Sequence, residues 1–362
     1  MVPAPCDSSN RRCRPTPLIS PFPAVLVAIL AVFAACWAPG PAVAQRVESP
    51  EVTAPDLAAP DLAAMIQSVV SVKAIVPSNA RTAESLGTER SGSGVVIDSS
   101  GLIVTIGYLV MEASSVEVRT PDGKTYPAEI VAYDQASGFG LLRGGYGFKG
   151  RPMRLGRSAE VKVGDPLLAL SGGGPEGVRA TQLVSRREFA GYWEYLLDEA
   201  LFTSPPVMEF GGAALVSPKG ELIGVGSLFV HDAAPPLSMP GNMFIPVDVL
   251  RPILGDLIAL GRTASPPRPW LGLTTHEEGD SLIIRQVTPG SPAASAGLRK
   301  NDAIVGVAGQ PVARLADLYR KIWALGDAGT RVPLDIRRGN QVETVPVMSM
   351  DRYRHLRLNP TF

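Results

Sequence analysis

Short runs of β-branched and other apolar residues, separated by turns, fill residues 65–262 and restrict the fold more than any other feature. The runs include QSVVSVKAIV, SGVVID, LIVTIGYLV, SVEVRT and YPAEIVAY, with Ser-Gly or Asp-Gly pairs between several of them. Such alternation suits strands with one buried face, and such turns join antiparallel neighbours. The 37 glycines and 34 prolines agree with many short strands and turns. We therefore expect a mostly β, antiparallel domain over residues 65–262.

A second, smaller domain is expected after TASPPRP, a proline-rich linker at residues 263–269. Residues 270–352 alternate short strands with one amphipathic helix, LADLYRKIWALG, and a tail follows at 353–362. The apolar residues of this helix repeat at helical spacing, and Gly326 is placed to end it. These apolar residues are Leu315, Leu318, Ile322 and Leu325.

One further helix is expected at the end of the first domain, in PVDVLRPILGDLIALGR. Its apolar residues recur every three or four positions, Asp248 can cap its N-terminus, and Gly261 can end it. Pro252 lies so near the start that only the first intrahelical bond is lost, so a single helix is predicted.

The first 44 residues have the layout of an export signal. A basic segment precedes the apolar run AVLVAILAVFAAC, and PAVAQ then allows cleavage after Ala44. We expect export to the periplasm or cell envelope, with retention as a membrane tether and lipidation at Cys36 as open alternatives. Residues 45–64, rich in proline, acidic and small residues, are typical of a tether.

Composition argues against several classes of chemistry. Lysine and arginine total 34 against 34 aspartate and glutamate, so no overall field attracts nucleic acid. The cysteines all lie in the leader, so a chain cut after Ala44 has no thiol chemistry. No metal-ligand spacing, P-loop or dinucleotide fingerprint occurs in the sequence, so neither a metal nor a cofactor is expected. The cysteines are Cys6, Cys13 and Cys36. The acidic groups Glu277 with Glu278, and Glu194 with Asp198 and Glu199, are interpreted as solvated surfaces.

Several segments occur in the order found in a known family. They are SGSGVVIDSSGLIVTIGYLV, GDPLLAL, GGAALVSPKGELIGVG, and NMFIPVDVLRPILGDLIALGR followed by WLGL. This set resembles the HtrA class of exported trypsin-like serine proteases, and VTPGSPAASAGLRKNDAIVGVAGQPV resembles the core of a bacterial PDZ domain. The resemblance covers roughly residues 65–350. It implies a trypsin-like double β-barrel followed by a C-terminal α+β PDZ domain.

The resemblance also locates the three positions of the catalytic triad. VTIGYLV stands where the family has V-T-N-N-H-V-V, which puts Tyr108 at the base. DQASGFGLL matches D-x-x-x-D-x-A-L-L, which puts Gly138 at the orienting carboxylate and leaves Asp134 at an outer position, expected on the surface. Aligning G-N-S-G-G-P-L-V on LV at residues 215–216 puts Gly211 at the nucleophile.

These residue types lack the chemistry of a serine hydrolase, which needs a nucleophile, a base, an orienting carboxylate and oxyanion donors. A phenol with an ordinary pKa of about 10 is a poor proton acceptor at neutral pH. Glu209 replaces a motif glycine and the upstream loop is one residue short, which is expected to disrupt the oxyanion hole. Because the residues at these positions depart from the family pattern, we expect no catalytic residue.

No other residue is expected to take over the chemistry. Ser171 in SGGGP follows GDPLLAL, where the family has a turn, and is interpreted as a turn residue. Ser204 has no neighbouring base and is interpreted as a loop hydroxyl. The three histidines lie in a loop, in the PDZ segment and in the basic tail, away from the cleft. They are His231, His276 and His355. Lys162 and Lys219 are interpreted as charges at strand ends or turns.

The PDZ segment carries the positive functional prediction. Such domains add a peptide strand to a sheet edge and hold its terminal carboxylate on backbone N–H groups of a glycine-containing loop. The stretch Trp270, Leu271, Gly272 and Leu273 resembles that loop. Leu315, Leu318 and Ile322 are expected to line an apolar pocket for the peptide, although they can equally fill the core.

We therefore predict an exported, catalytically inactive HtrA-like protein that binds peptides or unfolded proteins with apolar C-termini, in protein quality control at the envelope. Two alternatives stay open: an active serine endopeptidase that uses non-standard residues, and a structural accessory subunit of an active relative. Family trimers rely on aromatic residues near the start of the protease domain. The first aromatic residue after the leader is Tyr108, which leaves a homo-oligomer or association with an active homologue open.

Overall fold

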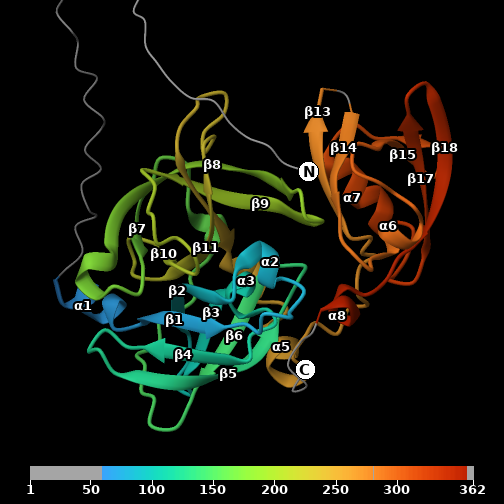
Figure 1. Cartoon of the computed structure of the whole chain (residues 1–362). Helices are drawn as coiled ribbons and strands as arrows, with labels where there is room; N and C mark the ends of the chain where they lie inside the picture. Colours follow the sequence, from blue (N-terminus) through green and yellow to red (C-terminus); the bar gives the residue numbers. More distant parts are fainter. Residues whose placement is uncertain (1–58, 280, 357–362) are drawn as a thin grey trace, which may run out of the picture. The chain divides into compact units, whose positions relative to one another are not determined.

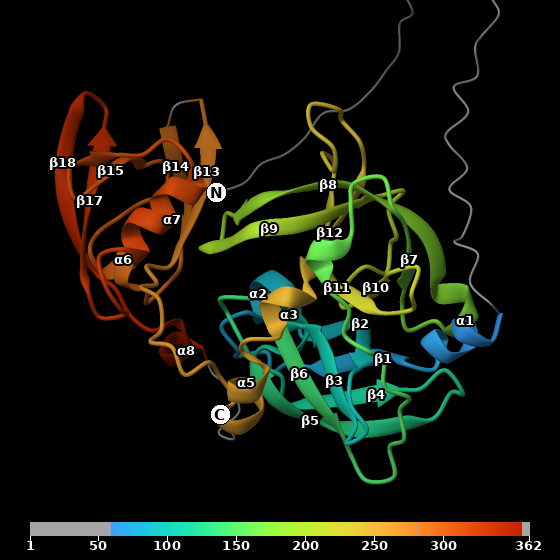
Figure 2. The ribbon, with the colours of Figure 1, turned by 180° about the vertical axis from the view of Figure 1, so that it is seen from behind.

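Two closed β-barrels and a separate sheet contain the strands of the described chain (Figures 1 and 2). The computed structural model describes residues 59–279 and 281–356. These residues lie within one compact unit of the chain, Glu51–Phe362. The expected export signal and its cysteines lie outside them. Among the helices of the described residues, none has the length and hydrophobicity needed to span a bilayer.

The first barrel closes in the strand order β1-β2-β3-β6-β5-β4. Alternating burial along β4 and complete burial along β3 follow from the apolar patterns of these strands. Helix α1 begins inside the stretch expected to be a tether. The elements are α1 (Ala59–Ile66), β1 (Val69–Ile75), α2 (Ala83–Leu86), β2 (Glu89–Val96), β3 (Leu102–Ile106), α3 (Gly107–Val110), β4 (Ser115–Arg119), β5 (Thr125–Tyr133) and β6 (Phe139–Gly144).

The second barrel closes in the equivalent order, β10-β11-β12-β9-β8-β7. Its longest strands, β8 and β9, form a hairpin whose register shifts twice. The elements are η1 (Ser158–Glu160), β7 (Pro166–Leu170), η2 (Gly174–Gly177), β8 (Val178–Gly191), β9 (Tyr195–Ser204), β10 (Ala214–Val216), β11 (Leu222–Val230) and β12 (Gly241–Pro246).

The C-terminal domain is an antiparallel sheet in the order β13-β14-β15-β17-β18, with β16 paired to β15. Along the chain, α6 lies between β14 and β15, α7 lies between β16 and β17, and α8 follows β18. The elements are β13 (Leu273–Glu278), β14 (Ser281–Val287), α6 (Pro292–Ser295), β15 (Ala303–Val307), β16 (Gln310–Pro311), α7 (Leu315–Trp323), β17 (Arg331–Arg338), β18 (Gln341–Met348) and α8 (Arg352–His355). The predicted double barrel followed by an α+β PDZ domain is thus confirmed.

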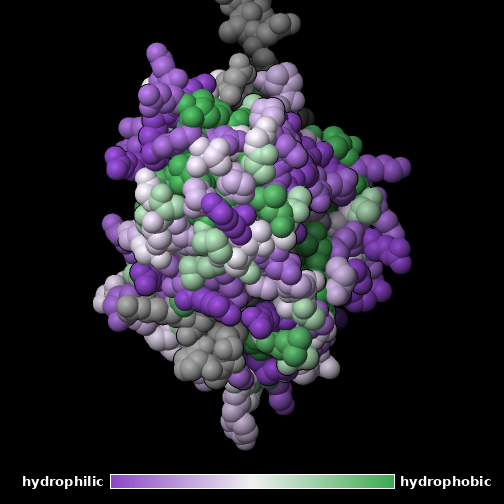
Figure 3. Space-filling view, turned by 90° about the vertical axis from the view of Figure 1, so that its right-hand side faces the viewer, coloured by the Kyte–Doolittle hydropathy of each residue, from purple (hydrophilic) through white to green (hydrophobic). Residues whose placement is uncertain are grey.

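Large apolar side chains are gathered in the interiors of the barrels and beneath α7. Phe139, Phe202 and Phe244 are fully buried in the barrels, and Tyr319 of α7 is 2% exposed. On the face that Figure 3 shows, hydrophobic residues form small patches among hydrophilic ones. That distribution is expected when the main apolar surface is inside the domains.

The single helix predicted over residues 248–261 is wrong. The chain forms α4 (Val247–Leu250) and α5 (Leu254–Leu260), separated by a turn that contains Pro252. Pro252 has no N–H to continue the helical bonding, which explains the break. Asp248 does not cap the helix; its Oδ2 accepts the N–H of Ala159 at 2.8 Å. Gly261 ends α5 with φ +73°, as predicted.

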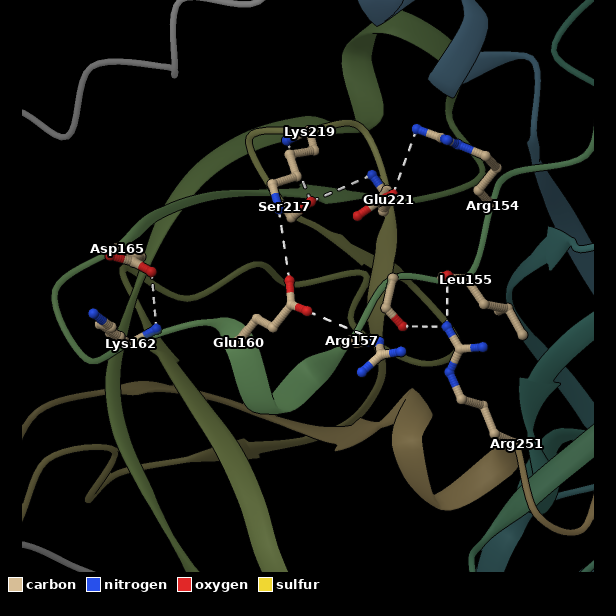
Figure 4. Close-up of polar contacts among 11 residues, drawn as sticks. Arg154, Leu155, Arg157, Glu160, Lys162, Asp165, Ser217, Lys219, Glu221 and Arg251 are labelled. Carbon is tan, nitrogen blue, oxygen red and sulfur yellow. Dashed lines mark hydrogen bonds and ion pairs between the residues drawn. The ribbon is translucent and has the colours of Figure 1, made fainter.

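Exposed ion pairs surround η1 (Figure 4). Glu160 lies 3.9 Å from Arg157 and 3.6 Å from Lys219. The backbone N–H of Lys162 donates to Asp165 at 2.8 Å, closing a turn. Lys219 is itself in the exposed turn before β11. Because such pairs contribute only about 0–1 kcal/mol each, this surface adds little to stability.

Candidate functional site

A cleft of about 820 Å³ opens at the trypsin-like positions identified from the sequence. Tyr108, Gly211 and the segment before Gly211 line it, together with backbone and side chains of β1 and β2. Four serines also line it, and none of the three histidines does. The serines are Ser71, Ser91, Ser93 and Ser171.

Tyr108 and Gly211 lie side by side in this cleft. A Cβ atom at Gly211 would be 2.8 Å from the Tyr108 hydroxyl oxygen. That hydroxyl donates a hydrogen bond to the backbone oxygen of Ser227 at 3.1 Å. Burial raises the pKa of Tyr108 above its ordinary value. The phenol is therefore a protonated donor, in a place where a serine hydrolase would need a proton acceptor.

Gly138 lies beside the same helix α3, because its backbone oxygen accepts the N–H of Gly107 at 2.7 Å. It adopts φ +83°, and a Cβ there would be 3.0 Å from the Tyr195 hydroxyl and 3.1 Å from Cδ1 of Ile245. The Tyr195 hydroxyl donates to the backbone oxygen of Ser137 at 2.7 Å. The space for a carboxylate is thus filled by a phenol from β9.

Asp134 is buried rather than on the surface, with 3% of its area exposed. Its Oδ2 accepts the N–H of Ser137 at 2.8 Å, which fixes the turn that leads to Gly138. Because this carboxylate is engaged in a local turn, it has a structural role that explains its burial. The expectation of a surface residue is therefore wrong.

The hairpin around Gly211 is tied closely to the first barrel. The N–H of Ser93 donates to the Gly211 oxygen at 2.8 Å. At Gly212, which has φ +75°, a Cβ would be only 2.0 Å from the Ser93 oxygen. The N–H of Gly212 donates to Gly226 at 2.8 Å, within the hairpin itself. The backbone around Gly211 is therefore fixed by hydrogen bonds to the first barrel and within the hairpin.

The other serines and histidines of interest have structural partners. Ser171 Oγ donates to Gly177 O at 3.3 Å, and Ser204 Oγ donates to Pro240 O at 2.9 Å. His276 is exposed and stacks on Tyr192. His355 does not belong to a free basic tail, because it is buried with its ring 4.7 Å from Trp270.

A buried polar network, which sequence reasoning missed, lies directly behind Tyr108. Arg90 and Glu112 are each only 4% exposed. Arg90 donates to the backbone oxygen of Tyr108 at 2.7 Å and to Thr82 Oγ1 at 2.8 Å. Thr82 Oγ1 in turn donates to Glu112 at 2.7 Å. This network holds the α3 segment, and with it Tyr108, in place.

The loop expected to bind a carboxylate does contact one, from within the chain. The backbone N–H groups of Leu271, Gly272 and Leu273 donate to the Glu194 carboxylate at 2.9, 2.6 and 2.9 Å. The N–H of Trp270 instead donates to Met350 O at 3.1 Å, so Trp270 is not a fourth donor. Glu194 lies at the tip of the β8–β9 hairpin and is 9% exposed. Its interpretation as a solvated surface residue is therefore wrong.

Helix α7 is covered by the same hairpin. Leu315, Leu318 and Ile322 are 6%, 1% and 2% exposed, and share an apolar cluster with Leu196 of β9. The Tyr319 hydroxyl donates to Gly191 O at 2.7 Å and accepts the Glu194 N–H at 3.3 Å. Tyr319 was not among the predicted site residues. Its only sequence signal is its place on α7, one position after Leu318.

Comparison with known proteins identifies both domains. Residues 92–225 match the trypsin-like peptidase domain family, and residues 269–348 match the PDZ domain family. A putative serine protease HhoA of Synechocystis sp. is 28% identical over 283 residues, covering 69% of this chain and 68% of that protein. A probable periplasmic serine endoprotease DegP-like of Chlamydia muridarum is 28% identical over 273 residues, covering 71% of this chain and 53% of that protein.

Solved structures share the fold. An HtrA-type protease AlgW with a decapeptide has a TM-score of 0.51 at 18% identity, covering 84% of this chain and all (100%) of that chain. A variant of AlgW with a tripeptide has a TM-score of 0.52 at 19% identity, covering 84% and 99%. At these identities the likeness concerns the fold alone, and the matched part spans about half of the Chlamydia relative.

Proposed function

We infer from the trypsin-like peptidase and PDZ domains of this chain, and from its similarity to HtrA and DegP-like serine proteases, that it binds polypeptides without cleaving them. In this proposal it is exported, and its PDZ domain captures the C-termini of peptides or unfolded proteins at the cell envelope. The expected ligands end in an apolar residue.

The single observation that carries this proposal is the composition of the cleft. Tyr108 and Gly211 meet in the cleft as a protonated phenol and a glycine, and the third triad position is Gly138 beside α3, so none of the three supplies a nucleophile or a base. The PDZ loop, by contrast, presents three backbone N–H groups that hold a carboxylate. The backbone donors needed to bind a C-terminus are therefore present, whereas the triad positions lack the groups needed for acyl transfer.

A second candidate function is proteolysis by non-standard residues. It is favoured by the serine-protease names of the relatives and by the serines that line the cleft. Ser93 is one of these serines, and its Oγ accepts the N–H of Gly172 at 2.9 Å and has no basic partner among the contacts of the described residues. A base for this candidate would have to come from the ionisable residues that line the cleft, such as Lys73, whose ammonium group is paired with Glu89 at 2.8 Å.

We expect the chain to bind a fluorescent decapeptide ending in a free apolar residue more tightly than the same peptide with an amidated C-terminus. Losing charge-assisted hydrogen bonds to a carboxylate is expected to weaken binding roughly tenfold or more. Fluorescence anisotropy over a wide concentration range measures both affinities. Equal affinity for the acid and the amide would rule out capture of C-termini.

A further inference from the structure

We propose that Glu194 is an intramolecular ligand of the PDZ carboxylate site, and that a polypeptide C-terminus binds there only by displacing it. This inference rests on the proposed function, because it concerns the same peptide site. It adds the identity of the group that competes for the site and the consequence that free and peptide-bound states differ in the position of the β8–β9 hairpin.

The first argument is the chemistry of the contact. Both Glu194 oxygens are used: Oε1 accepts the N–H groups of Gly272 and Leu273, and Oε2 accepts that of Leu271. A terminal carboxylate would need these same donors, and each N–H carries a single hydrogen. Two carboxylates on one loop would also repel each other at low local dielectric. Occupation by Glu194 and by a peptide is therefore mutually exclusive.

The second argument is the backbone at the hairpin tip. Residues 192–194 join β8 to β9, and Glu194 has φ +60°. A three-residue hairpin loop usually ends in a left-handed residue, a position that favours glycine. A glutamate there adopts a sparsely populated conformation, which persists where the surroundings hold it. The hydrogen bonds between its carboxylate and the PDZ loop stabilise this conformation.

The third argument is that the hairpin lies along both elements expected to hold a peptide. The N–H of Thr275 in β13 donates to Tyr192 O at 3.1 Å, and the Tyr319 hydroxyl of α7 donates to Gly191 O at 2.7 Å. Arg320 of α7 pairs with Glu188 and Asp198, each at 2.6 Å. The hairpin thus makes one backbone hydrogen bond to the edge strand β13 and fills the carboxylate site, two of the contacts that a bound peptide would use.

The contact is buried but its outer ion pairs are accessible. Burial raises the pKa of Glu194, while the three N–H donors and Arg352 oppose that rise. Arg320 and Asp198 are 46% and 84% exposed, so these pairs are screened by solvent. Detachment of the hairpin also separates Leu196 from the apolar cluster of α7. A peptide with an apolar C-terminal residue would cover that cluster while its carboxylate replaces the one that leaves.

The test compares two substitutions at one position. Glu194→Gly removes the carboxylate and suits the left-handed backbone, whereas Glu194→Gln keeps the size and removes only the charge. Both are expected to bind a decapeptide with a free apolar C-terminus more tightly than the unmodified chain, by about tenfold or more, because an internal competitor reduces apparent affinity by the fraction of open sites. Fluorescence anisotropy gives each affinity.

Glu199→Gln is the matched control. Glu199 lies on the same hairpin, is 64% exposed, and pairs with Arg186 of β8. Its substitution changes the net charge equally without touching the PDZ loop, so the peptide affinity is expected to stay within about twofold of the unmodified chain. Thermal unfolding of each variant confirms that the compared proteins are folded.

Amide hydrogen exchange provides a second readout that needs no peptide. The N–H groups of Leu271, Gly272 and Leu273 are expected to exchange faster in Glu194→Gly than in the unmodified chain. Tighter peptide binding together with faster exchange supports the proposal. If Glu194→Gly and the unmodified chain bind the peptide with equal affinity, the displacement proposal is overturned and the proposed function stands. If neither protein binds the peptide, the proposed function fails, and displacement of Glu194 fails with it.

Discussion

Changing Tyr108→His, Gly138→Asp and Gly211→Ser together is expected to give a protein that still cleaves casein no faster than buffer and is less stable. The limiting position is Gly138, where φ is +83° and a Cβ would be 3.0 Å from the Tyr195 hydroxyl. Strain in the left-handed region and overpacking against Tyr195 together destabilise by roughly 2–4 kcal/mol. Urea unfolding and casein digestion are the two measurements.

Tyr195→Phe provides the control for this steric argument. The short contact at Gly138 is with the phenol oxygen, so Gly138→Asp combined with Tyr195→Phe should recover part of the lost stability. Tyr108→His with Gly211→Ser, without the change at Gly138, should be better tolerated, since the Tyr108 hydroxyl that crowds Gly211 is then gone. Casein cleavage by the triple variant would contradict the view that the fold around the cleft has closed over the carboxylate position.

Glu112→Ala is expected to lower the free energy of unfolding by about 3–5 kcal/mol, because it removes three hydrogen bonds and the negative charge that faces Arg90 across Thr82. Glu112 accepts the N–H groups of Arg81 and Thr82 at 3.1 and 2.8 Å, and Thr82 Oγ1 at 2.7 Å. Alanine would leave these donors unsatisfied and the Arg90 charge uncompensated in the interior. Urea unfolding followed by tryptophan fluorescence measures the change.

Glu112→Gln separates charge from shape in the same network. The amide can still accept from Thr82 but no longer balances Arg90, so an intermediate loss is expected. Replacing Arg90→Met in the Glu112→Gln background removes the unpaired buried charge but also the donors to Tyr108 O and Met111 O, so only part of the lost stability should return. A loss below about 1 kcal/mol for Glu112→Ala would show that the network carries little of the stability.

The antiparallel strands could be predicted from the sequence because their signals are local, whereas the double barrel and the three triad positions came from the resemblance to the HtrA family. Alternating residues and Ser-Gly or Asp-Gly turns determine strands one at a time, and short motifs place Tyr108, Gly138 and Gly211. The adjacency of Tyr108 and Gly211 is a contact between the two barrels, because Tyr108 follows β3 of the first barrel and Gly211 precedes β10 of the second.

The failures involve residues whose partners are distant or whose local rule is overridden. Glu194 looks like one charge in an acidic stretch, and its partners lie 77 to 79 positions later in the chain. His355 looks like part of a basic tail, yet it packs on Trp270. The helix around Pro252 fails for a local reason, since the missing N–H outweighed the apolar periodicity. Nothing within a few residues of Glu194 indicates a carboxylate-binding loop.

The most direct test of the central claim is the rate at which the purified chain hydrolyses unfolded casein, measured beside its labelling by a fluorophosphonate probe. A cleft whose triad positions hold a protonated phenol and two glycines is expected to give a rate equal to that of buffer and no added mass on the protein. Casein hydrolysis that co-purifies with the chain, with a covalent label lost on Ser93→Ala or Ser171→Ala, would contradict the account.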